Sequence, residues 1–160
     1  MTHLARPEDW DHLGNELKPG HPAAVLFSQR QVSDQTARGI PLPLADWIVF
    51  KLSGAIHPLH PTQAASTGLW SIHSAEWYHP WIARLGLEGL RLPEVSTQPA
   101  GRLGQIGCRS LLFLPPIGDQ QAALLGVGLQ PGDLSINAAT GSQVSVIIDK
   151  RITPTSPKCI

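Results

Sequence analysis

One aspartate, Asp119, has neighbours that would suit a catalytic base. The sequence around it predicts a buried strand over Leu111 to Leu114, a tight loop, and a helix over Gln120 to Val127 that Gly128 ends. A carboxylate at the start of that helix meets unpaired backbone N–H groups and the positive end of the helix dipole, which favour its charged form. Aspartate is also a preferred N-cap residue. Asp119 is therefore a candidate base and equally a candidate cap.

A second candidate for chemistry is the turn Thr140-Gly141-Ser142. It separates two alternating runs, Leu134 to Ala139 and Val144 to Ile148, which predict a β-hairpin. Backbone N–H groups and hydroxyls in such a turn can donate hydrogen bonds to phosphate oxygens, although most turns of this composition only reverse the chain. The turn follows Asp119 closely enough in the sequence for both to face one cleft.

The segment from Ala55 to Tyr78 contains His57, His60 and His73, and His79 follows it directly. Neutral imidazole is a common zinc ligand, so a metal site is the obvious hypothesis. The spacing does not match an HExxH or a cysteine-histidine site, and Glu76 is the only carboxylate within the segment. The sequence therefore predicts no metal site here.

The five tryptophans suggest a different function, a carbohydrate-binding module that stacks sugars on exposed rings. Indole rings bury large apolar areas, and at helical spacing they are more often part of a core. Trp77 and Trp81 are four residues apart, as two core residues on one face of a helix would be. A stacking module requires exposed rings at Trp70, Trp77 and Trp81, so their solvent accessibility separates the two hypotheses.

The elements that must position these residues are short. One predicted helix ends at Ser53-Gly54 and has an apolar face made of Leu44, Trp47, Ile48 and Leu52. Another covers Trp77 to Leu85, with Pro80 in its first turn. The small-residue segment Thr62 to Ile72 is compatible with a strand or hairpin that lines a cavity. Ala23 to Phe27 fits either a short strand or the start of a helix.

Composition limits the classes of protein. The 160 residues are 42% hydrophobic, which suits one domain with a core. Twelve basic and 12 acidic residues give zero formal charge, which argues against a nucleic-acid or anionic-membrane surface. No apolar run approaches the ~20 residues of a membrane span, and the first residues lack the apolar core of a signal peptide. Cys108 and Cys159 form no metal or redox spacing, so a reduced, cytoplasmic setting is expected.

Several short blocks between residues 44 and 148 carry a family resemblance through their order and spacing. They are Asp46-Trp47, Lys51-Leu52-Ser53-Gly54, Ala64-Ala65-Ser66-Thr67-Gly68-Leu69, Trp77, Leu92-Pro93-Glu94-Val95, Gly104-Gln105-Ile106, Gly118-Asp119-Gln120-Gln121-Ala122-Ala123 and Ala139-Thr140-Gly141-Ser142-Gln143. In this order the blocks are similar to the FGGY carbohydrate kinases, which include glycerol kinase, xylulokinase and sedoheptulokinase. In that family two ribonuclease-H-like domains of the actin and hexokinase type close on ATP and a sugar or polyol.

The resemblance implies a mixed α/β fold, namely an incomplete ribonuclease-H-like domain followed by the first strands of a second one. Residues 1–133 would be the later part of the N-terminal sugar-binding domain, and residues 134–160 the start of the C-terminal ATP-binding domain. ATP and Mg²⁺ are the implied cofactors, and a sugar or polyol is the implied substrate. The implied reaction is transfer of the γ-phosphate of ATP to a substrate hydroxyl.

The resemblance also implies roles for individual residues. Asp119 would accept the proton of the substrate hydroxyl, Gln120 would contact the sugar, and the turn formed by Thr140, Gly141 and Ser142 would face the ATP phosphates. Ser66 and Trp70 are further candidates for substrate contact, and His60 is a candidate cavity residue.

The chain also departs from the family pattern. The Asp-x-Gly-Thr turn with which FGGY kinases begin does not occur in it, and the tail ITPTSPKCI is unlike the end of a folded domain. The expectation is a fragment with half an active site and little kinase activity of its own. Open strand edges would invite self-association into a homo-oligomer. A non-catalytic carbohydrate-binding or interaction module that uses Trp70, Trp77 and Trp81 is the alternative.

Overall fold

The computed structural model of the protein describes residues 1–33, 38–98, 102–106, 109–138, 140–150 and 152. Its helices are η1 (Thr2–Leu4), α1 (Pro7–His12), α2 (Pro22–Arg30), α3 (Leu44–Ser53), α4 (Pro61–Ser66), α5 (His79–Arg84) and α6 (Asp119–Val127). Its strands are β1 (Trp70–Ser71), β2 (Glu76–Trp77), β3 (Arg102–Ile106), β4 (Arg109–Leu112), β5 (Leu134–Asn137) and β6 (Gln143–Val146). Across these described residues, no helix has the length and apolar character that crossing a membrane would require.

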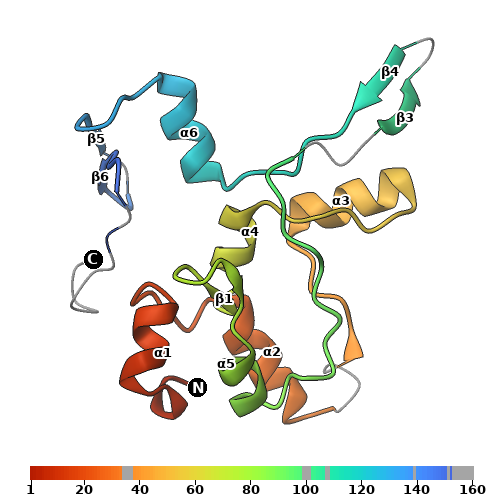
Figure 1. Ribbon diagram of the computed structural model, residues 1–160, viewed down its shortest axis with the longest axis vertical. Coiled ribbons are helices and arrows are strands. Elements are labelled where there is room, and N and C mark those ends of the chain that lie inside the picture. The colour runs from red at the N-terminus through yellow and green to blue at the C-terminus, as the bar shows by residue number, and fades with distance from the viewer. Residues whose placement is uncertain (34–37, 99–101, 107–108, 139, 151, 153–160) are drawn as a thin grey trace.

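The elements form three groups, which Figure 1 shows well separated. A body of helices surrounds the N-terminus, the β3–β4 hairpin projects beside α3, and α6 leads into the β5–β6 hairpin. Each strand pairs antiparallel with one neighbour, and within the described ranges no third strand joins any pair. A parallel bridge between Leu59 and Val95 brings the segment before α4 beside the long connection to β3.

The hydrophobic core lies within the N-terminal body, and Trp81 of α5 is fully buried in it. The Nε1 atom of Trp81 donates a hydrogen bond to the carbonyl oxygen of Gly68 (3.1 Å). Gly68 has a φ of +72°, and a Cβ at this position would lie 3.1 Å from Nδ1 of His21 and 3.3 Å from Cβ of Ala23. The position therefore requires glycine for both its conformation and its close packing. The buried members of the core are Leu13, Leu17, Ala23, Leu69, Trp81, Ile82, Leu85, Leu87 and Leu90.

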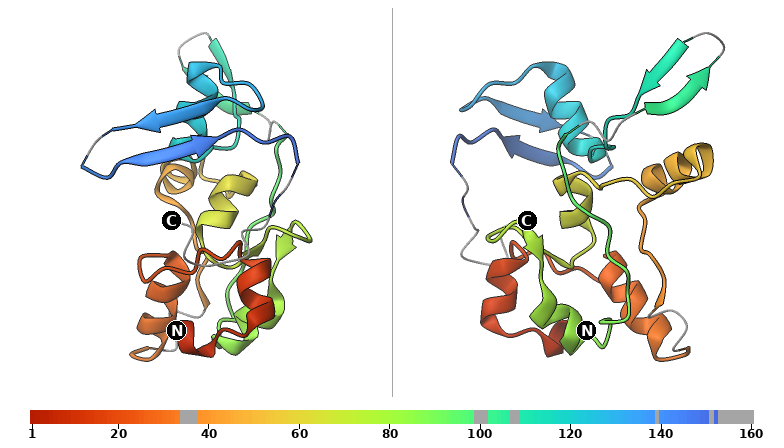
Figure 2. Two further views of the ribbon diagram at one scale, coloured as in Figure 1. Left: turned by 90° about the vertical axis from the view of Figure 1, so that its left-hand side faces the viewer. Right: turned by 45° about the vertical axis from the view of Figure 1, so that its right-hand side comes forward.

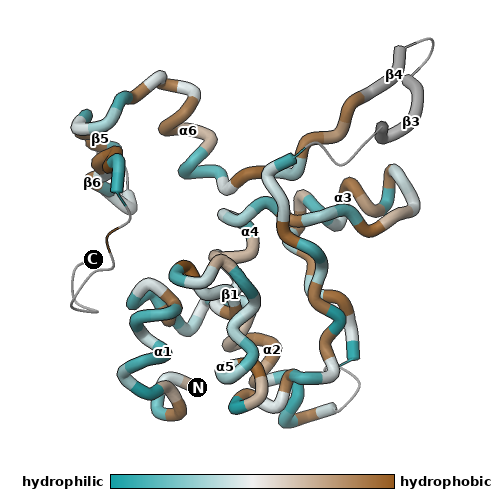
Figure 3. The backbone as a smooth tube through the Cα atoms, viewed as in Figure 1, coloured by the Kyte–Doolittle hydropathy of each residue, from teal (hydrophilic) through white to brown (hydrophobic). Residues whose placement is uncertain are grey.

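Two helices and one hairpin agree with the local sequence patterns. α3 ends at Gly54 (φ 73°) and α6 ends at Gly128 (φ 75°), both in the left-handed conformation that commonly ends a helix. β5 and β6 form the predicted hairpin, with Asn137 opposite Gln143. The apolar residues of these elements are nonetheless exposed, and hydrophobic segments lie outside the N-terminal body in Figure 3. They include Leu44, Trp47, Ile48, Leu52, Leu125, Val127, Leu134, Ile136, Val144 and Val146.

The prediction of a buried strand over Leu111 to Leu114 is wrong in part. β4 ends at Leu112, and both Leu112 and Leu114 are exposed, at 63% and 61%. Phe113 is buried. Pro115 and Pro116 follow directly, and since proline has no N–H to donate to a ladder, the strand cannot continue through them.

The segment Thr62 to Ile72 is a strand only at its end. Pro61 occupies the first turn of α4 and His60 is its N-cap residue, so the segment begins as a helix. Trp70–Ser71 then forms β1. Residues of both parts line a cavity, which agrees with that part of the prediction. Upstream, Ala23 to Phe27 lie within α2, so the helical alternative is the correct one there.

The prediction that Trp77 and Trp81 share one face of a helix is wrong. α5 begins at His79 with Pro80 in its first turn, so Trp77 precedes the helix and lies in β2. There it stands opposite Trp70, with the two rings edge to face and their centroids 5.3 Å apart. Proline suits only the first turn of a helix, which places the start of α5 after Trp77.

Candidate active site

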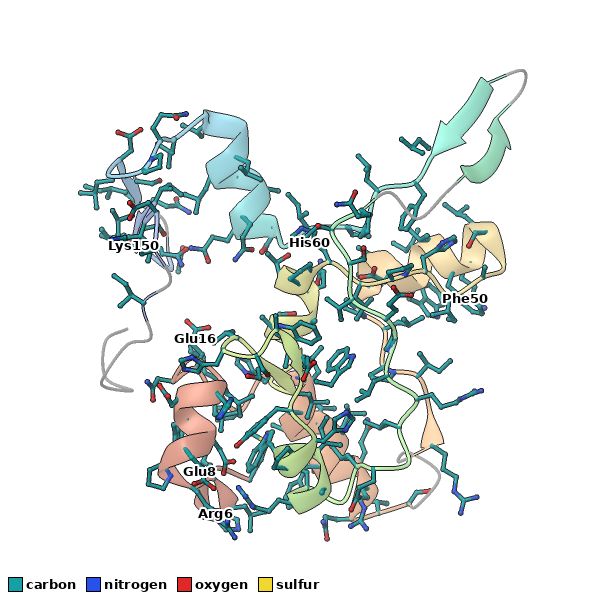
Figure 4. The ribbon with its side chains drawn as sticks, in the orientation of Figure 1. Arg6, Glu8, Glu16, Phe50, His60 and Lys150 are labelled. Atoms are coloured by element: carbon teal, nitrogen blue, oxygen red, sulfur yellow. The ribbon has the colours of Figure 1, made fainter. Side chains whose placement is uncertain are left out.

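A cavity of about 990 Å³ lies where α4, the start of α3 and the start of α6 meet the loop after α1. Figures 1 and 2 show α4 between the N-terminal body and α6. Candidate residues from three elements line the cavity: Asp119 and Gln120 from α6, Ser66 from α4 and Trp70 from β1. The loop after α1 adds Glu16, which Figure 4 labels. The structure thus brings the predicted base and the predicted substrate contacts around one space.

Asp119 is the first residue of α6, and Gly118 is the N-cap residue in its place. The alternative in which Asp119 caps the helix is therefore wrong. Its Oδ1 atom accepts a hydrogen bond from the N–H of Gln120 (2.7 Å), and the side chain is exposed. Glycine is tolerated as an N-cap, so the helix can start without using this carboxylate. Asp119 is consequently available to a ligand in the cavity.

The start of α6 is tied to α4 by two hydrogen bonds. The N–H of Gly118 donates to Oγ1 of Thr62 (2.9 Å), and Nε2 of Gln63 donates to the carbonyl oxygen of Ile117 (3.2 Å). Ile117 and Gly118 are the two residues that directly precede Asp119 in the chain. His60, which the sequence placed at the cavity, is not among the described residues of its lining; Figure 4 shows it where the start of α4 approaches the start of α6.

The tryptophans that a sugar-stacking surface would require are largely inside the protein. Trp70 is 7% exposed and Trp81 is fully buried. Trp77 is half-buried, and its Nε1 atom donates a hydrogen bond to the carbonyl oxygen of Pro93 (2.8 Å). The alternative of a carbohydrate-binding module depends on exposed rings. For Trp70 and Trp81 this expectation is wrong. Trp70 instead forms part of the cavity wall.

The turn Thr140-Gly141-Ser142 is exposed and is not among the described residues that line the cavity. A different part of the same hairpin approaches the site: Nε2 of Gln120 donates a hydrogen bond to Oγ of Ser145 (3.1 Å). Ser145 lies opposite Ser135, near the end of the hairpin that is farther from the turn. The structure therefore links the hairpin to the cavity through Gln120, and the turn lies at the hairpin's other end.

Sequence reasoning missed Thr62 and Gln63 as residues that hold the site together. Because their segment was expected to be a strand or hairpin, neither side chain had a predicted partner. The signal was present in Pro61, since proline followed by polar residues is typical of a helix start. It also missed His21, which lines the cavity beside Glu16. Burial lowers the pKa of His21, and the charge of Glu16 opposes that effect.

The histidines do not form a metal centre in the part of the chain that the structure describes, where no three His, Cys, Asp or Glu side chains are placed to hold an ion. His57 contacts Oγ of Ser53 through Nε2 (3.0 Å), and His60 contacts Thr62. His73 lies beside Asp11 (3.2 Å). Each of these rings therefore has a protein contact of its own.

Curated relatives match part of the chain. Glycerol kinase 2 of Pseudomonas aeruginosa is 36% identical over 101 residues, covering 59% of this chain and 20% of the relative. Glycerol kinase of Shewanella amazonensis is 34% identical over 105 residues, with the same two coverages of 59% and 20%. The chain spans about a fifth of the length of these relatives. No protein-family model matches it.

Solved structures match more of the chain. A glycerol kinase from Plasmodium falciparum, crystallised with ADP, superposes with a TM-score of 0.73 at 16% identity and covers 88% of this chain and 30% of its own. A ligand-bound xylulose kinase from Lactobacillus acidophilus gives a TM-score of 0.70 at 19% identity, with coverages of 86% and 30%. At these identities the likeness shows the fold, which is part of the mixed α/β, actin-like fold of carbohydrate kinases.

The sequence matches and the structural matches thus both lead to carbohydrate kinases, each over part of the kinase's length. The glycerol kinase matches and the structural neighbours support the predicted FGGY carbohydrate kinase family over part of a kinase's length, and the predicted mixed α/β, actin-like fold class is confirmed.

Proposed function

We propose that this chain forms the sugar- or polyol-binding half of an ATP-dependent carbohydrate kinase, with Asp119 as the base. The observation that carries the proposal is the shared cavity, which Asp119, Gln120, Ser66 and Trp70 all line. In this proposal residues 1–133 belong to the sugar-binding domain and residues 134–160 begin the ATP-binding domain. A cytoplasmic setting, where ATP is available, fits this function.

Phosphoryl transfer requires little covalent chemistry from a protein, which must align the attacking hydroxyl and stabilise the moving charge. An exposed carboxylate on the cavity wall can accept a hydrogen bond from a substrate hydroxyl and so orient it toward the phosphate. Asp119 would then receive the hydroxyl proton as the new O–P bond forms. Its own hydrogen bond uses the N–H of Gln120 at Oδ1, so Oδ2 is left for the substrate.

The remaining cavity residues suit a polyhydroxylated ligand. The amide of Gln120 can donate and accept hydrogen bonds with sugar hydroxyls. The hydroxyl of Ser66 donates to the carbonyl oxygen of Gln63 (2.8 Å) and can accept from a sugar hydroxyl. Trp70 contributes an apolar wall of the kind that packs against the C–H groups of a sugar. Small-ligand sites commonly combine apolar walls with a few polar groups, and the volume of about 990 Å³ is enough for a small sugar.

ATP and Mg²⁺ are the cofactors that this function implies. The turn Thr140-Gly141-Ser142 has hydroxyl and backbone donors that fit phosphate oxygens. A Cβ at Gly141 would meet nothing within 4 Å, so the space beside this backbone is open to a ligand. Mg²⁺ in kinases is held largely by phosphates and water, with one or two carboxylates, and needs no dedicated protein cage. When bound, MgATP supplies the phosphoryl group.

Binding to this chain itself is the first test of the proposal. Titration of the isotope-labelled protein with glycerol, xylulose and gluconate should shift the NMR signals of Gln120, Ser66 and the Trp70 indole for at least one compound. The Trp47 indole, on the exposed face of α3, serves as the control signal. Absence of any change at the cavity residues with all three compounds would contradict a substrate site here.

Catalysis is tested in a chimera in which this chain replaces the matching part of the Pseudomonas aeruginosa glycerol kinase 2. We expect ATP-dependent phosphorylation of one of the three compounds, and a loss of roughly 10²- to 10⁴-fold in kcat for Asp119→Asn, the usual size of a general-base contribution. Asp149→Asn, at an exposed aspartate of the same chain, should leave the rate unchanged. Equal rates in wild type and Asp119→Asn would show that the assigned base is wrong.

A further inference from the structure

A chain of hydrogen bonds connects His60 to the start of α6. The backbone N–H of Gly118 donates to Oγ1 of Thr62 (2.9 Å), and this same oxygen lies 2.9 Å from Nδ1 of His60. The backbone N–H of Thr62 also donates to that nitrogen (3.2 Å). A ring nitrogen that accepts from an N–H carries no proton. The hydroxyl of Thr62 therefore donates to His60, which turns its lone pairs toward Gly118.

The imidazole of His60 takes the place of the usual N-cap side chain. Pro61 has no N–H, so the N–H of Thr62 is the first in α4 that needs a partner, and Nδ1 of His60 supplies it. Burial lowers the pKa of His60, which favours the neutral ring that this arrangement requires. His60 thereby fixes the hydroxyl of Thr62 in the orientation that accepts from Gly118.

α6 depends on such contacts because it has no buried side chain to pack into the N-terminal body. Among its described residues none is buried. Gly118 is held from both sides, since its N–H donates to Thr62 and its carbonyl oxygen accepts from the N–H of Ala122 (2.8 Å). The bond from Gln63 to Ile117 adds a second link to α4. These bonds fix the backbone immediately before Asp119 against the start of α4.

We propose that His60 and Thr62 are positioning residues that set the start of α6 and thereby the direction in which Asp119 faces the cavity. The part of this inference that assigns Asp119 as a base rests on the proposed function, whereas the bonds from Thr62 do not. Positioning of this kind matters because a displacement of about 1 Å in a catalytic group can cost on the order of 10²-fold in rate.

Hydrogen exchange of the Gly118 amide tests the inference in the 160-residue chain. With glycine isotopically labelled, the amide signal of Gly118 is followed by NMR, and the amide of Gly68 in the core reports on the integrity of the body. In wild type the Gly118 amide should exchange at least tenfold more slowly than an unprotected glycine, as a backbone group in a native hydrogen bond does.

Paired substitutions separate positioning from general stability. Thr62→Val keeps the side-chain shape but removes the hydroxyl, and should raise the exchange rate of Gly118 about tenfold while Gly68 is unchanged. Thr62→Ser keeps the hydroxyl and should restore protection. His60→Ala should raise the rate, and His60→Asn, whose side chain can still cap α4, should restore most of the protection. His79→Ala, at the start of α5, is the matched control and should change neither signal.

An unprotected Gly118 amide in wild type, or unchanged protection in Thr62→Val, would overturn the proposal. If Thr62→Val unfolds the body, the Gly68 amide loses protection as well, and the comparison of His60→Ala with His60→Asn then decides: equal exchange at Gly118 in that pair would overturn it. The readout contains no sugar and no ATP. Failure of the kinase proposal would therefore appear in the chimera assay and leave these exchange rates unaffected.

Discussion

Arg84 in α5 forms an ion pair with Asp9 in α1, and the carboxylate of Asp9 is fully buried. Oδ2 of Asp9 also accepts a hydrogen bond from the N–H of Arg6 (2.7 Å), at the start of α1. The pair therefore joins two helices that are 75 residues apart in the chain, at the edge of the core. Removal of one partner from a buried pair costs more than the pair itself contributes, because it leaves an uncompensated charge.

We therefore expect Arg84→Met to lower the free energy of unfolding by about 3–5 kcal/mol, the range for a broken buried pair. The double variant Asp9→Asn with Arg84→Met should recover most of that loss, because asparagine is uncharged and can still accept from the N–H of Arg6. Urea denaturation followed by circular dichroism measures both.

The control for this pair is Glu8, which forms an exposed ion pair with Arg6 (3.6 Å). Glu8→Gln should change the free energy of unfolding by less than about 1 kcal/mol, as exposed pairs do. A loss in Arg84→Met as small as that in Glu8→Gln would show that the buried pair does not stabilise the fold.

Asp46 in the first turn of α3 predicts a specific pH dependence of stability. Its side chain is 5% exposed, and neither carboxylate oxygen makes a hydrogen bond to another described residue. Burial raises the pKa of Asp46 from 3.8 to about 6, an effect that its own backbone N–H partly offsets. The folded protein therefore holds this proton at a pH where the unfolded chain has already lost it.

The sign follows from linkage. The contribution of Asp46 to stability is fully present below pH 3.8, falls as the pH rises toward about 6, and is constant above that. Asp46→Asn removes this fall, so the difference in unfolding free energy between variant and wild type should grow in favour of the variant between those two values, by about 3 kcal/mol at most. Thermal or urea unfolding of both proteins across this range measures the difference.

Asp149→Asn, at an exposed position, is the matched control and should give a pH-independent difference from wild type. The same flat difference in Asp46→Asn would mean that the carboxyl of Asp46 is not shielded from water in the folded protein.

The parts of this fold that the sequence predicts are those determined by near neighbours. Gly54 and Gly128 end their helices because the left-handed conformation is local to each glycine. The β5–β6 hairpin depends on a turn and two alternating runs. Pro80 fixes the start of α5 and, with it, the separation of Trp77 from Trp81. Because proline favours the first positions of a helix, Pro80 predicts a helix start close before it and therefore a Trp77 that lies outside the helix.

The contacts that build the candidate site are of another kind. Gly118 and Thr62 are 56 residues apart, and neither residue type indicates the other. The apolar residues of α3 are a second example. Their helical spacing predicts that they share one face, but it does not predict whether another element covers that face, and in the structure the face is exposed. Asp119 and Gln120 could be singled out through the resemblance, whereas the residues that hold them depend on tertiary contacts that no local pattern encodes.

The hydrogen bond from Nε2 of Gln120 to Oγ of Ser145 has a consequence for ligand binding. If Gln120 contacts the sugar, its amide must give up or share the bond to β6 when the ligand arrives. Ser145→Ala frees that amide in advance, so the affinity for the sugar should rise by roughly 2- to 10-fold, which corresponds to the usual 0.5–1.5 kcal/mol of one such bond. Isothermal titration of the ligand identified by NMR measures the change.

Ser135 provides the matched control, because it lies opposite Ser145 on β5. Ser135→Ala removes the same group from the same hairpin and should leave the affinity unchanged. Equal effects of the two substitutions would trace the change to the stability of the hairpin, and unchanged affinity in Ser145→Ala would mean that the sugar does not compete for the amide of Gln120. A rise in affinity in Ser145→Ala alone would show that ligand binding in the cavity is coupled to the position of the hairpin that begins the proposed ATP-binding domain.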